Sequence, residues 1–398
     1  MDVDDARTIG WRLRRVRDDR GKPLRVIAEL AGMSKATLSR IERGERSPTL
    51  KELVALADAL QISVSELTRL PVPAPANGHT DSTTKAIGLA LDAIELGHPG
   101  GLVLPVVVLR DRVARFLQHK RACRFPDVAA ELPGLVRDLH TTLATGADHG
   151  ELLELAVYLH VHVTSYWLIL AAAPDDLRRR IVFLARRLAH ERGEVTTLGL
   201  AGFAVAETLL ASGAFELAQT ELDSLILPPT TAATASLVGT LTAVHSRAAA
   251  LNGRPNEAAA AMDTAADIAG RFGELGETDS LGFEFGPTWV GFRRVRRALD
   301  AGEPDRAVSI AEGLHPEQHP APYGHAFHWV GYGRALAQLR GRRDDAVRAL
   351  RRAETMNPVR VRRNPLVRDT IAVLLPGARR DAVGQQLRDM ASRAGLRG

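Results

Sequence analysis

Basic and hydroxyl side chains are concentrated in the first part of the chain. Eight basic residues lie between Arg7 and Arg25 against two acidic ones, and five lie between Ser34 and Lys51 against two. Arginine, lysine and hydroxyl groups are the usual donors to the phosphate oxygens of a nucleic acid. The amino-terminal segment is therefore predicted to present a positive face to a polyanion.

Apolar residues spaced by three and four positions, and separated by breakers, predict five short helices in residues 1–70. The third helix begins after Ser34, whose hydroxyl is a good N-cap, and faces the core through Leu38 and Ile41. Four small or polar residues lie on the outward side of this helix: Lys35, Ala36, Ser39 and Arg40. These side chains are placed to contact a partner rather than the core.

Two of these helices are joined at Gly32, which is the sequence form of a helix-turn-helix. The wider run resembles the Xre-type family of phage and bacterial repressors (Cro-like regulators). The resemblance rests on Ile9-Gly10, Gly32-Met33-Ser34, Leu38 to Gly44 and Ser47-Pro48. It covers most of residues 1–70 and implies a domain that binds double-stranded DNA.

The resemblance also implies roles for individual residues. The third helix is expected to enter the major groove, with Lys35, Ala36 and Arg40 facing base edges. Five residues are expected to contact the phosphate backbone: Arg25, Ser34, Thr37, Arg43 and Ser47. Arg17 and Glu42 occupy the positions of an internal ion pair that ties the first helix to the third.

Residues 71–84 have no apolar periodicity and carry Pro71, Pro73 and Pro75. Alternate prolines favour extended backbone, and the polar residues that follow favour a loop. The sequence therefore predicts a linker over residues 71–84 between a DNA-binding domain of residues 1–70 and a second domain of residues 85–398.

The second domain contains a repeat. Four glycines are each followed five residues later by an alanine: Gly213 and Ala218, Gly253 and Ala258, Gly302 and Ala307, Gly341 and Ala346. A helix that ends at glycine, turns, and restarts with a small residue is typical of a tetratricopeptide-like hairpin. Because aromatic residues are only 5% of the chain, helices are favoured over sheets. We predict an all-α fold in which the five-helix domain is followed by a tetratricopeptide-like α-superhelix of degenerate repeats.

The carboxyl half also resembles a group of actinobacterial regulators that combine an Xre-type domain with such a superhelix. The resemblance rests on Phe285-Gly286-Pro287-Thr288, on Asn364 to Arg368 and on a closing helix from Leu387 to Gly395. It departs at Trp289, where a polar residue is more usual. The resemblance implies a transcription regulator.

Several other classes of protein are not indicated. There is no phosphate-binding loop, nucleophile elbow or zinc-protease helix, so no enzyme and no cofactor is expected. The single Cys123 excludes an intramolecular disulfide and favours a cytoplasmic protein. The apolar run 155–173 is interrupted by polar residues and is interpreted as a buried helix rather than a membrane span. The histidines between His315 and His328 are interpreted as part of a loop, with no metal expected.

Two groups of aromatic residues are candidates for an effector pocket. One group comprises Tyr158, Tyr166 and Trp167, and the other comprises Phe285, Trp289 and Phe292. They would line a site for a small molecule or a peptide, or else pack between hairpins. We expect a homodimer, because one small head makes few base contacts. The alternative is a helical-repeat adaptor for another protein, in which DNA binding is secondary or lost.

Overall fold

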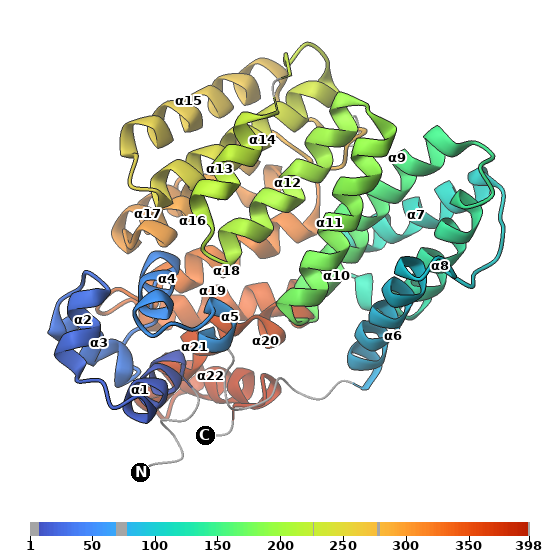
Figure 1. The fold of residues 1–398 in the computed structure, drawn as a ribbon. Helices are drawn as coiled ribbons and strands as arrows, with labels where there is room; N and C mark the ends of the chain where they lie inside the picture. The colour runs from blue at the N-terminus through green and yellow to red at the C-terminus, as the bar shows by residue number, and fades with distance from the viewer. Residues whose placement is uncertain (1–7, 69–77, 226, 277–278, 397–398) are drawn as a thin grey trace.

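The protein is all-α in the computed structural model, which describes residues 8–68, 78–225, 227–276 and 279–396. No β-strand occurs within these ranges. The first five helices form a small domain, hereafter the head. The remaining helices form stacked hairpins that run from the right of the view (cyan) across its top (green and yellow) and return below (orange and red) to lie next to the head (Figure 1). The predicted all-α fold class, a five-helix domain followed by a helical superhelix, is confirmed.

The head contains α1 (Ile9–Asp19), α2 (Leu24–Leu30), α3 (Lys35–Glu42), α4 (Leu50–Ala59) and α5 (Val64–Thr68). The C-terminal domain contains α6 (Gly78–Glu95), α7 (Val106–Arg121), α8 (Leu132–Leu143), α9 (His149–Leu159), the π-helical turn η4 (His160–Thr164), α10 (Ser165–Leu170), α11 (Asp175–Arg192), α12 (Val195–Ala211), α13 (Phe215–Asp223), α14 (Ala232–Leu251), α15 (Pro255–Phe272), α16 (Pro287–Ala301), α17 (Pro304–Glu312), the short 3-10 turn η6 (Pro316–Gln318), α18 (Pro322–Leu336), α19 (Arg343–Met356), α20 (Pro358–Arg363), α21 (Pro365–Leu374) and α22 (Ala382–Arg393).

The four predicted hairpins are present. They are α12–α13, α14–α15, α16–α17 and α18–α19, and each turns at one of the four glycines. The turn glycines have left-handed φ values of 87°, 78°, 78° and 75°, a conformation that costs glycine little. The alanine five residues after each glycine is at most 1% exposed, because it lies where the two helices of a hairpin cross closely. The glycine–alanine spacing therefore marks real hairpins.

The predicted linker is wrong in its second half, because α6 begins at Gly78 rather than at residue 85. Thr80 and Thr83 are buried on this first part of the helix although they are polar. Threonine can be buried on a helix because its hydroxyl bonds back to a carbonyl, as Thr84 Oγ1 does to Thr80 O at 2.9 Å. Asp81 also forms an ion pair with Arg363 of α20. Residues 71–77 of the predicted linker lie outside the described residues.

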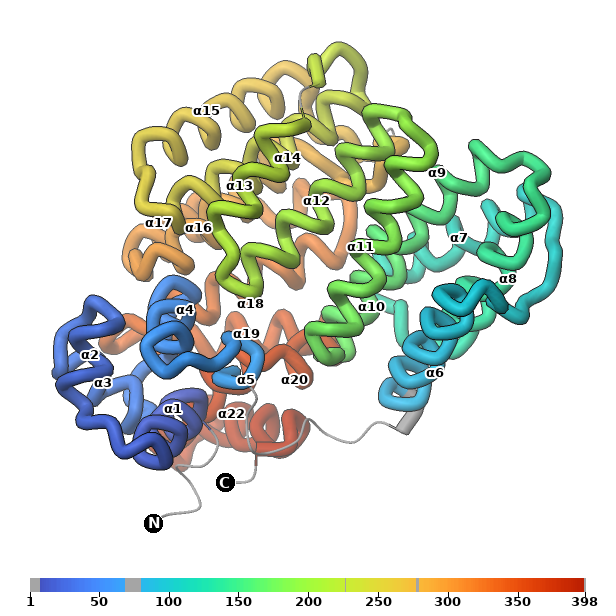
Figure 2. Tube along the Cα trace, in the orientation of Figure 1, coloured from blue at the N-terminus to red at the C-terminus, as the bar shows by residue number. Residues whose placement is uncertain are grey.

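The apolar run near the middle of the chain forms α9, η4 and α10. The segment His149–Leu170 is long and apolar enough to cross a membrane, but 72% of its most apolar window is buried inside the protein. Leu152, Val157 and Trp167 from this segment lie in the main hydrophobic core, which extends from α6 to α14. The segment packs as the predicted core helix, and the tube in Figure 2 shows it enclosed between α7 and α11.

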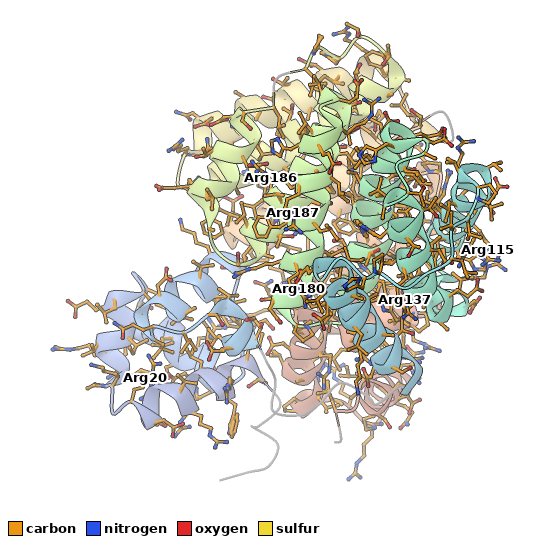
Figure 3. The ribbon with its side chains drawn as sticks, turned by 45° about the vertical axis from the view of Figure 1, so that its right-hand side comes forward. Arg20, Arg115, Arg137, Arg180, Arg186 and Arg187 are labelled. Carbon is orange, nitrogen blue, oxygen red and sulfur yellow. The ribbon has the colours of Figure 1, made fainter. Side chains whose placement is uncertain are left out.

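Surface arginines of the C-terminal domain are largely paired with acidic residues. Arg180 contacts Asp92 and Glu95, and Arg186 contacts Glu221. Both arginines lie along α11 in Figure 3. Arginine abundance in this domain therefore produces solvated ion pairs rather than a continuous positive face.

Candidate nucleic-acid interface

The third helix of the head has one buried and one exposed side, as predicted. Leu38 and Ile41 are fully buried in the head core, whereas Lys35, Ala36 and Arg40 are exposed. The hydroxyl of Ser34 caps the helix by accepting a hydrogen bond from Thr37 N at 3.0 Å. The cationic side of α3 is therefore presented to solvent.

The helix is held against α1 by a close backbone approach. A Cβ atom on Gly10 would lie 1.7 Å from the carbonyl oxygen of Ile41, so only glycine fits at this position. Arg17 and Glu42 reinforce the same contact through two hydrogen bonds, Nε to Oε1 at 2.6 Å and Nη2 to Oε2 at 2.7 Å. This bidentate pair fixes the direction in which α3 points.

Four of the five predicted phosphate contacts are accessible. Arg25, Ser34 and Arg43 are exposed, and Thr37 is half-buried. The hydroxyls of Ser34 and Thr37 lie 2.9 Å apart. Arg43 forms an ion pair with Glu45, at 2.7 Å, and this glutamate also lies 3.8 Å from Arg40.

Ser47 is the exception, and its predicted role as a phosphate contact is wrong for this structure. Its side chain is buried, and its hydroxyl donates a hydrogen bond to Asp369 of α21. The sequence of the head alone could not show this contact, because Asp369 lies more than three hundred positions further along the chain.

Comparison with known proteins identifies the head. Residues 13–67 match a family model described as Helix-turn-helix. The HTH-type transcriptional regulator SutR of Escherichia coli (strain K12) is 42% identical over 60 residues, which are 15% of this chain and 34% of SutR. The head is a helix-turn-helix domain. The chain spans about a third of the length of this curated relative.

Two solved structures show low overall similarity to this chain. PlcR from Bacillus thuringiensis, in complex with the peptide PapR7 and DNA, is 13% identical, with a TM-score of 0.28 and coverage of 79% of this chain and 96% of PlcR. The apo form of the competence regulator ComR from Streptococcus vestibularis is 17% identical, with a TM-score of 0.24 and coverage of 79% of this chain and 100% of ComR.

The helix-turn-helix domain is docked on the C-terminal domain through polar contacts. Asp369 is 1% exposed, and its Oδ1 accepts a hydrogen bond from the backbone N–H of Ile9 at 2.8 Å, while Oδ2 accepts from Ser47. Burial raises the pKa of Asp369, and the two hydrogen bonds act in the opposite direction. A carboxylate at this depth is stable only when its oxygens are paired, so Asp369 holds the domain in a defined position.

Apolar contacts complete the docking. Leu366 of α21 packs against the core of the helix-turn-helix domain. Val54 of α4 lies beside the turn at Gly213, where an added Cβ atom would be 3.0 Å from its methyl groups, and Thr49 lies beside the turn at Gly302, where the corresponding distance is 3.4 Å. In Figure 1 the domain lies beside the C-terminal helices and next to the α16–α17 hairpin. The exposed residues of α3 take no part in these contacts.

The predicted effector residues are mostly packed in the core. Trp167, Phe285 and Phe292 are at most 1% exposed and pack in the hydrophobic cores, so their proposed role as pocket walls is wrong for this structure. The ring of Phe285 fills the space beside Gly239, where a Cβ would lie 2.1 Å from it. Trp167 stacks on Phe125 with ring centroids 5.6 Å apart. These residues hold the hairpins together.

The other three residues lie around one buried region. Tyr166 and Trp289 belong to the two different aromatic groups, and Tyr323 contacts both, with ring centroids 6.5 and 6.4 Å away. The ring centroids of Tyr158 and of His162 in η4 lie 4.9 Å apart. The structure thus brings the two groups together at a tyrosine that the sequence did not single out.

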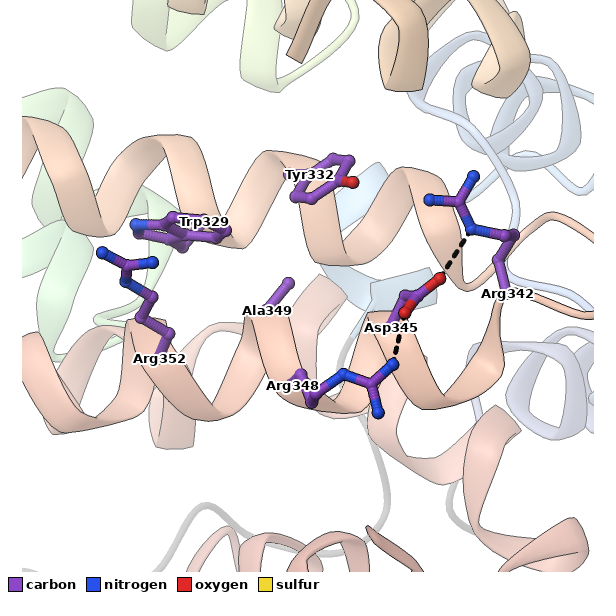
Figure 4. Close-up of a pocket in the computed structure, with 7 residues that line it drawn as sticks. All are labelled: Trp329, Tyr332, Arg342, Asp345, Arg348, Ala349 and Arg352. Carbon is purple, nitrogen blue, oxygen red and sulfur yellow. Dashed lines mark hydrogen bonds and ion pairs between the residues drawn. The ribbon is translucent and has the colours of Figure 1, made fainter. Parts of the chain in front are cut away.

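An open pocket of about 270 Å³ lies between α18 and α19 and is separate from these residues (Figure 4). Its walls are formed by Trp329, Tyr332, Arg342, Asp345, Arg348, Ala349 and Arg352. Asp345 pairs with Arg342 and Arg348, and the guanidinium of Arg352 lies 4.2 Å from the centroid of the Trp329 ring. Glu312, outside these walls, also accepts hydrogen bonds from Tyr332 and Arg342, whereas Trp329 Nε1 has no hydrogen-bond partner within the described residues.

The histidine-rich segment does not assemble a cluster of metal ligands in the part of the chain that the structure describes. His319 is buried, and its Nδ1 lies 3.0 Å from the carbonyl oxygen of Ala321. His325 Nε2 instead lies 2.9 Å from the carbonyl of His319. These contacts fix the loop that leads into α18.

Proposed function

We propose that the protein is a sequence-specific DNA-binding transcription regulator whose α3 enters the major groove. The observation that carries this proposal is the exposed pair of cations on α3, Lys35 and Arg40, on a helix whose other side is anchored in the core. Both side chains donate to guanine, and Ala36 between them offers apolar contact to a thymine methyl. Arg25 and Arg43 flank this surface as phosphate contacts.

The regulator acts as a cytoplasmic homodimer in this proposal. One helix-turn-helix domain offers only three base-facing residues, and a pair of domains reads two half-sites about 34 Å apart. Two-fold symmetry of the protein then corresponds to an inverted repeat in the DNA.

The C-terminal domain controls the spacing of the two DNA-binding domains. Docking through Asp369 leaves α3 exposed, so the superhelix positions each domain without covering its DNA-binding face. An effector that binds one arrangement of the superhelices better than another changes the half-site spacing that the dimer accepts. A small molecule or a peptide is the expected effector.

Selection of random duplex DNA by the full-length protein, followed by sequencing, tests the proposal. We expect an enriched inverted repeat whose binding weakens steeply as salt increases, because phosphate contacts release counterions. The matched Arg40→Ala protein should enrich a different or weaker sequence. Recovery of no sequence, with no salt-dependent affinity for duplex DNA, would contradict the proposed function.

A further inference from the structure

The open pocket between α18 and α19 carries a surplus of positive charge. Three guanidinium groups lie on its walls, those of Arg342, Arg348 and Arg352. Two carboxylates pair with them, because Asp345 contacts Arg342 and Arg348, and Glu312 outside the walls contacts Arg342. Glu317, a further carboxylate near this region, is exposed and lies 3.3 Å from His315 instead. The pairing therefore leaves one positive charge for a partner.

That surplus charge lies on Arg352. Its guanidinium forms no hydrogen bond or ion pair with the described residues, whereas the adjacent Arg351 contacts Glu354 at 2.8 Å. Arg352 is stacked instead on Trp329, 4.2 Å from the ring centroid. A guanidinium that covers an aromatic face keeps the N–H groups at its edge available to a carboxylate. The side chain is therefore held in place without being paired.

Trp329 adds a second unpaired donor at the same end of the pocket. Its indole nitrogen is buried and has no hydrogen-bond partner within the described chain. In Figure 4 this nitrogen lies next to the guanidinium of Arg352. Buried polar atoms are normally paired, and both unpaired groups here are donors. The group missing from this end of the pocket is therefore an acceptor with negative charge.

The remaining walls offer a rigid apolar surface. His328 is 3% exposed, and its ring centroid lies 5.1 Å from that of Trp329 and 6.0 Å from that of Tyr332. Opposite these rings, α19 presents the small side chain of Ala349 between two arginines (Figure 4). A preformed site loses little conformational entropy on binding. Tryptophan, tyrosine and arginine are also the residues that dominate the binding energy of protein interfaces.

We propose that the α18–α19 pocket docks an acidic peptide segment of a partner protein, in which a carboxylate residue is next to an aromatic one. The carboxylate pairs with Arg352, beside the indole N–H of Trp329. The aromatic side chain packs on Tyr332 and Ala349. This docking adds a protein partner to the proposed DNA binding and does not depend on it.

The shape and charge of the pocket select this class of partner. A free small molecule is usually enclosed over most of its surface, whereas this pocket of about 270 Å³ is open and admits side chains from outside. Duplex DNA is bound by several neighbouring cations, and its additional phosphates would lie beside Asp345 and Glu312. A neutral segment would leave Arg352 unpaired. A single carboxylate with an apolar neighbour satisfies both the donors and the rings.

Nuclear magnetic resonance of the full-length protein with ¹⁵N-labelled indole groups tests this site directly. The chain has four tryptophans, and Trp329→Phe identifies the signal of Trp329. The probe is acetyl-Phe-Glu-amide at millimolar concentration, compared with acetyl-Phe-Gln-amide and acetyl-Ala-Glu-amide. We expect acetyl-Phe-Glu-amide to move the Trp329 signal. The glutamine peptide should bind about tenfold more weakly because it cannot form a charge-assisted hydrogen bond, and the alanine peptide should also bind more weakly.

Arg352→Gln separates charge pairing from a general effect on the fold. This variant should bind acetyl-Phe-Glu-amide about tenfold more weakly and keep the Tm of the wild type, because Arg352 is exposed. Arg187→Gln removes an equal charge from an exposed position on α11, outside the pocket. It should change neither the affinity nor the Tm.

Three results would overturn the proposal: an unmoved Trp329 signal with acetyl-Phe-Glu-amide, an equal affinity for the glutamine peptide, or an unchanged affinity in Arg352→Gln. Random duplex DNA that moves this signal when the peptide does not would assign the pocket to nucleic acid instead. A protein that binds the peptide but enriches no DNA would contradict only the proposed function.

Discussion

The helix-turn-helix domain has two polar faces that use their donors in different ways. On the recognition face, Lys35 and Arg40 are exposed, and the nearest carboxylate to Arg40, from Glu45, is 3.8 Å away. On the docking face, the amide of Ile9 and the hydroxyl of Ser47 are buried against Asp369. Exposed donors remain available to DNA, whereas buried donors require an acceptor within the protein. One domain can therefore be fixed in position and still be ready to bind.

This difference favours control by position over control by occlusion. If the C-terminal domain covered α3, an effector would have to release the whole domain. Because it holds the docking face instead, we expect small movements of α21, which packs against the domain through Leu366, to shift the domain. Substitutions on the docking face should therefore change mainly the stability of the protein, and substitutions on the recognition face should change mainly its preference among DNA sequences.

The largest effect is expected at the ion pair that joins the two faces. Arg17 lies on α1, which carries the docking amide of Ile9, and Glu42 lies on the recognition helix α3. Glu42→Ala leaves a buried guanidinium without its carboxylate and should lower the free energy of unfolding by about 3–5 kcal/mol. Urea denaturation measures this loss. The double variant Arg17→Met with Glu42→Leu should recover much of it, and failure to recover would show that the pair is not the cause.

Loss of the docking carboxylate should have the next largest effect. Asp369→Ala leaves two buried donors unpaired, the Ile9 N–H and the Ser47 hydroxyl, and should cost about 3 kcal/mol in unfolding free energy. The same variant should broaden the half-site spacing selected from random DNA, since the domain is no longer held. Asp389→Ala, at an exposed position on α22, serves as the control. An unchanged stability and an unchanged spacing in Asp369→Ala would contradict the docking model.

A substitution on the recognition face is expected to change discrimination between DNA sequences and to leave the stability of the protein unchanged. Arg40→Ala removes a donor that faces bases and should reduce the preference for the operator by about 1–3 kcal/mol, measured as relative Kd values at fixed salt. Its melting temperature should stay within the error of the wild type, because Arg40 is exposed. Arg20→Ala, which removes an equal charge at the residue that follows α1, should leave the base preference intact. Equal losses in both variants would mean that charge alone, and not base contact, is responsible.

The sequence correctly predicted the parts of the molecule whose structure depends on residues that are near one another in the chain. Ser34 as an N-cap and Gly32 as a breaker act within a few residues, so the boundaries of the five head helices could be predicted closely. The glycine turns of the hairpins act in the same way. Thr80 and Thr83 were assigned to a linker because threonine is not an apolar marker, although its methyl group can be buried.

The contacts that could not be predicted join distant parts of the chain. Asp369 lies 360 positions from Ile9, and nothing near either residue indicates the hydrogen bond between them. The same holds for Arg121 of α7 and Glu284 in the loop before α16, which form an ion pair with Nε and Oε1 2.8 Å apart. The aromatic groups were correctly noticed, but composition could not show that Trp167 and Phe285 are packed while Tyr166 and Trp289 both lie beside Tyr323.

Substitution of Ser47 is expected to have the smallest effect, and it tests the difference between the two faces most directly. Ser47→Ala removes one of the two hydrogen bonds to Asp369 and should lower the free energy of unfolding by about 1 kcal/mol, measured by urea denaturation of the full-length protein. Operator affinity and the slope of its salt dependence should not change, because the hydroxyl faces α21 and not the phosphate backbone. Ser309→Ala, at an exposed site on α17, should change neither quantity. If Ser47 instead contacted phosphate, as its position in the helix-turn-helix domain alone suggests, its removal would weaken binding to all sequences alike and leave stability unaffected.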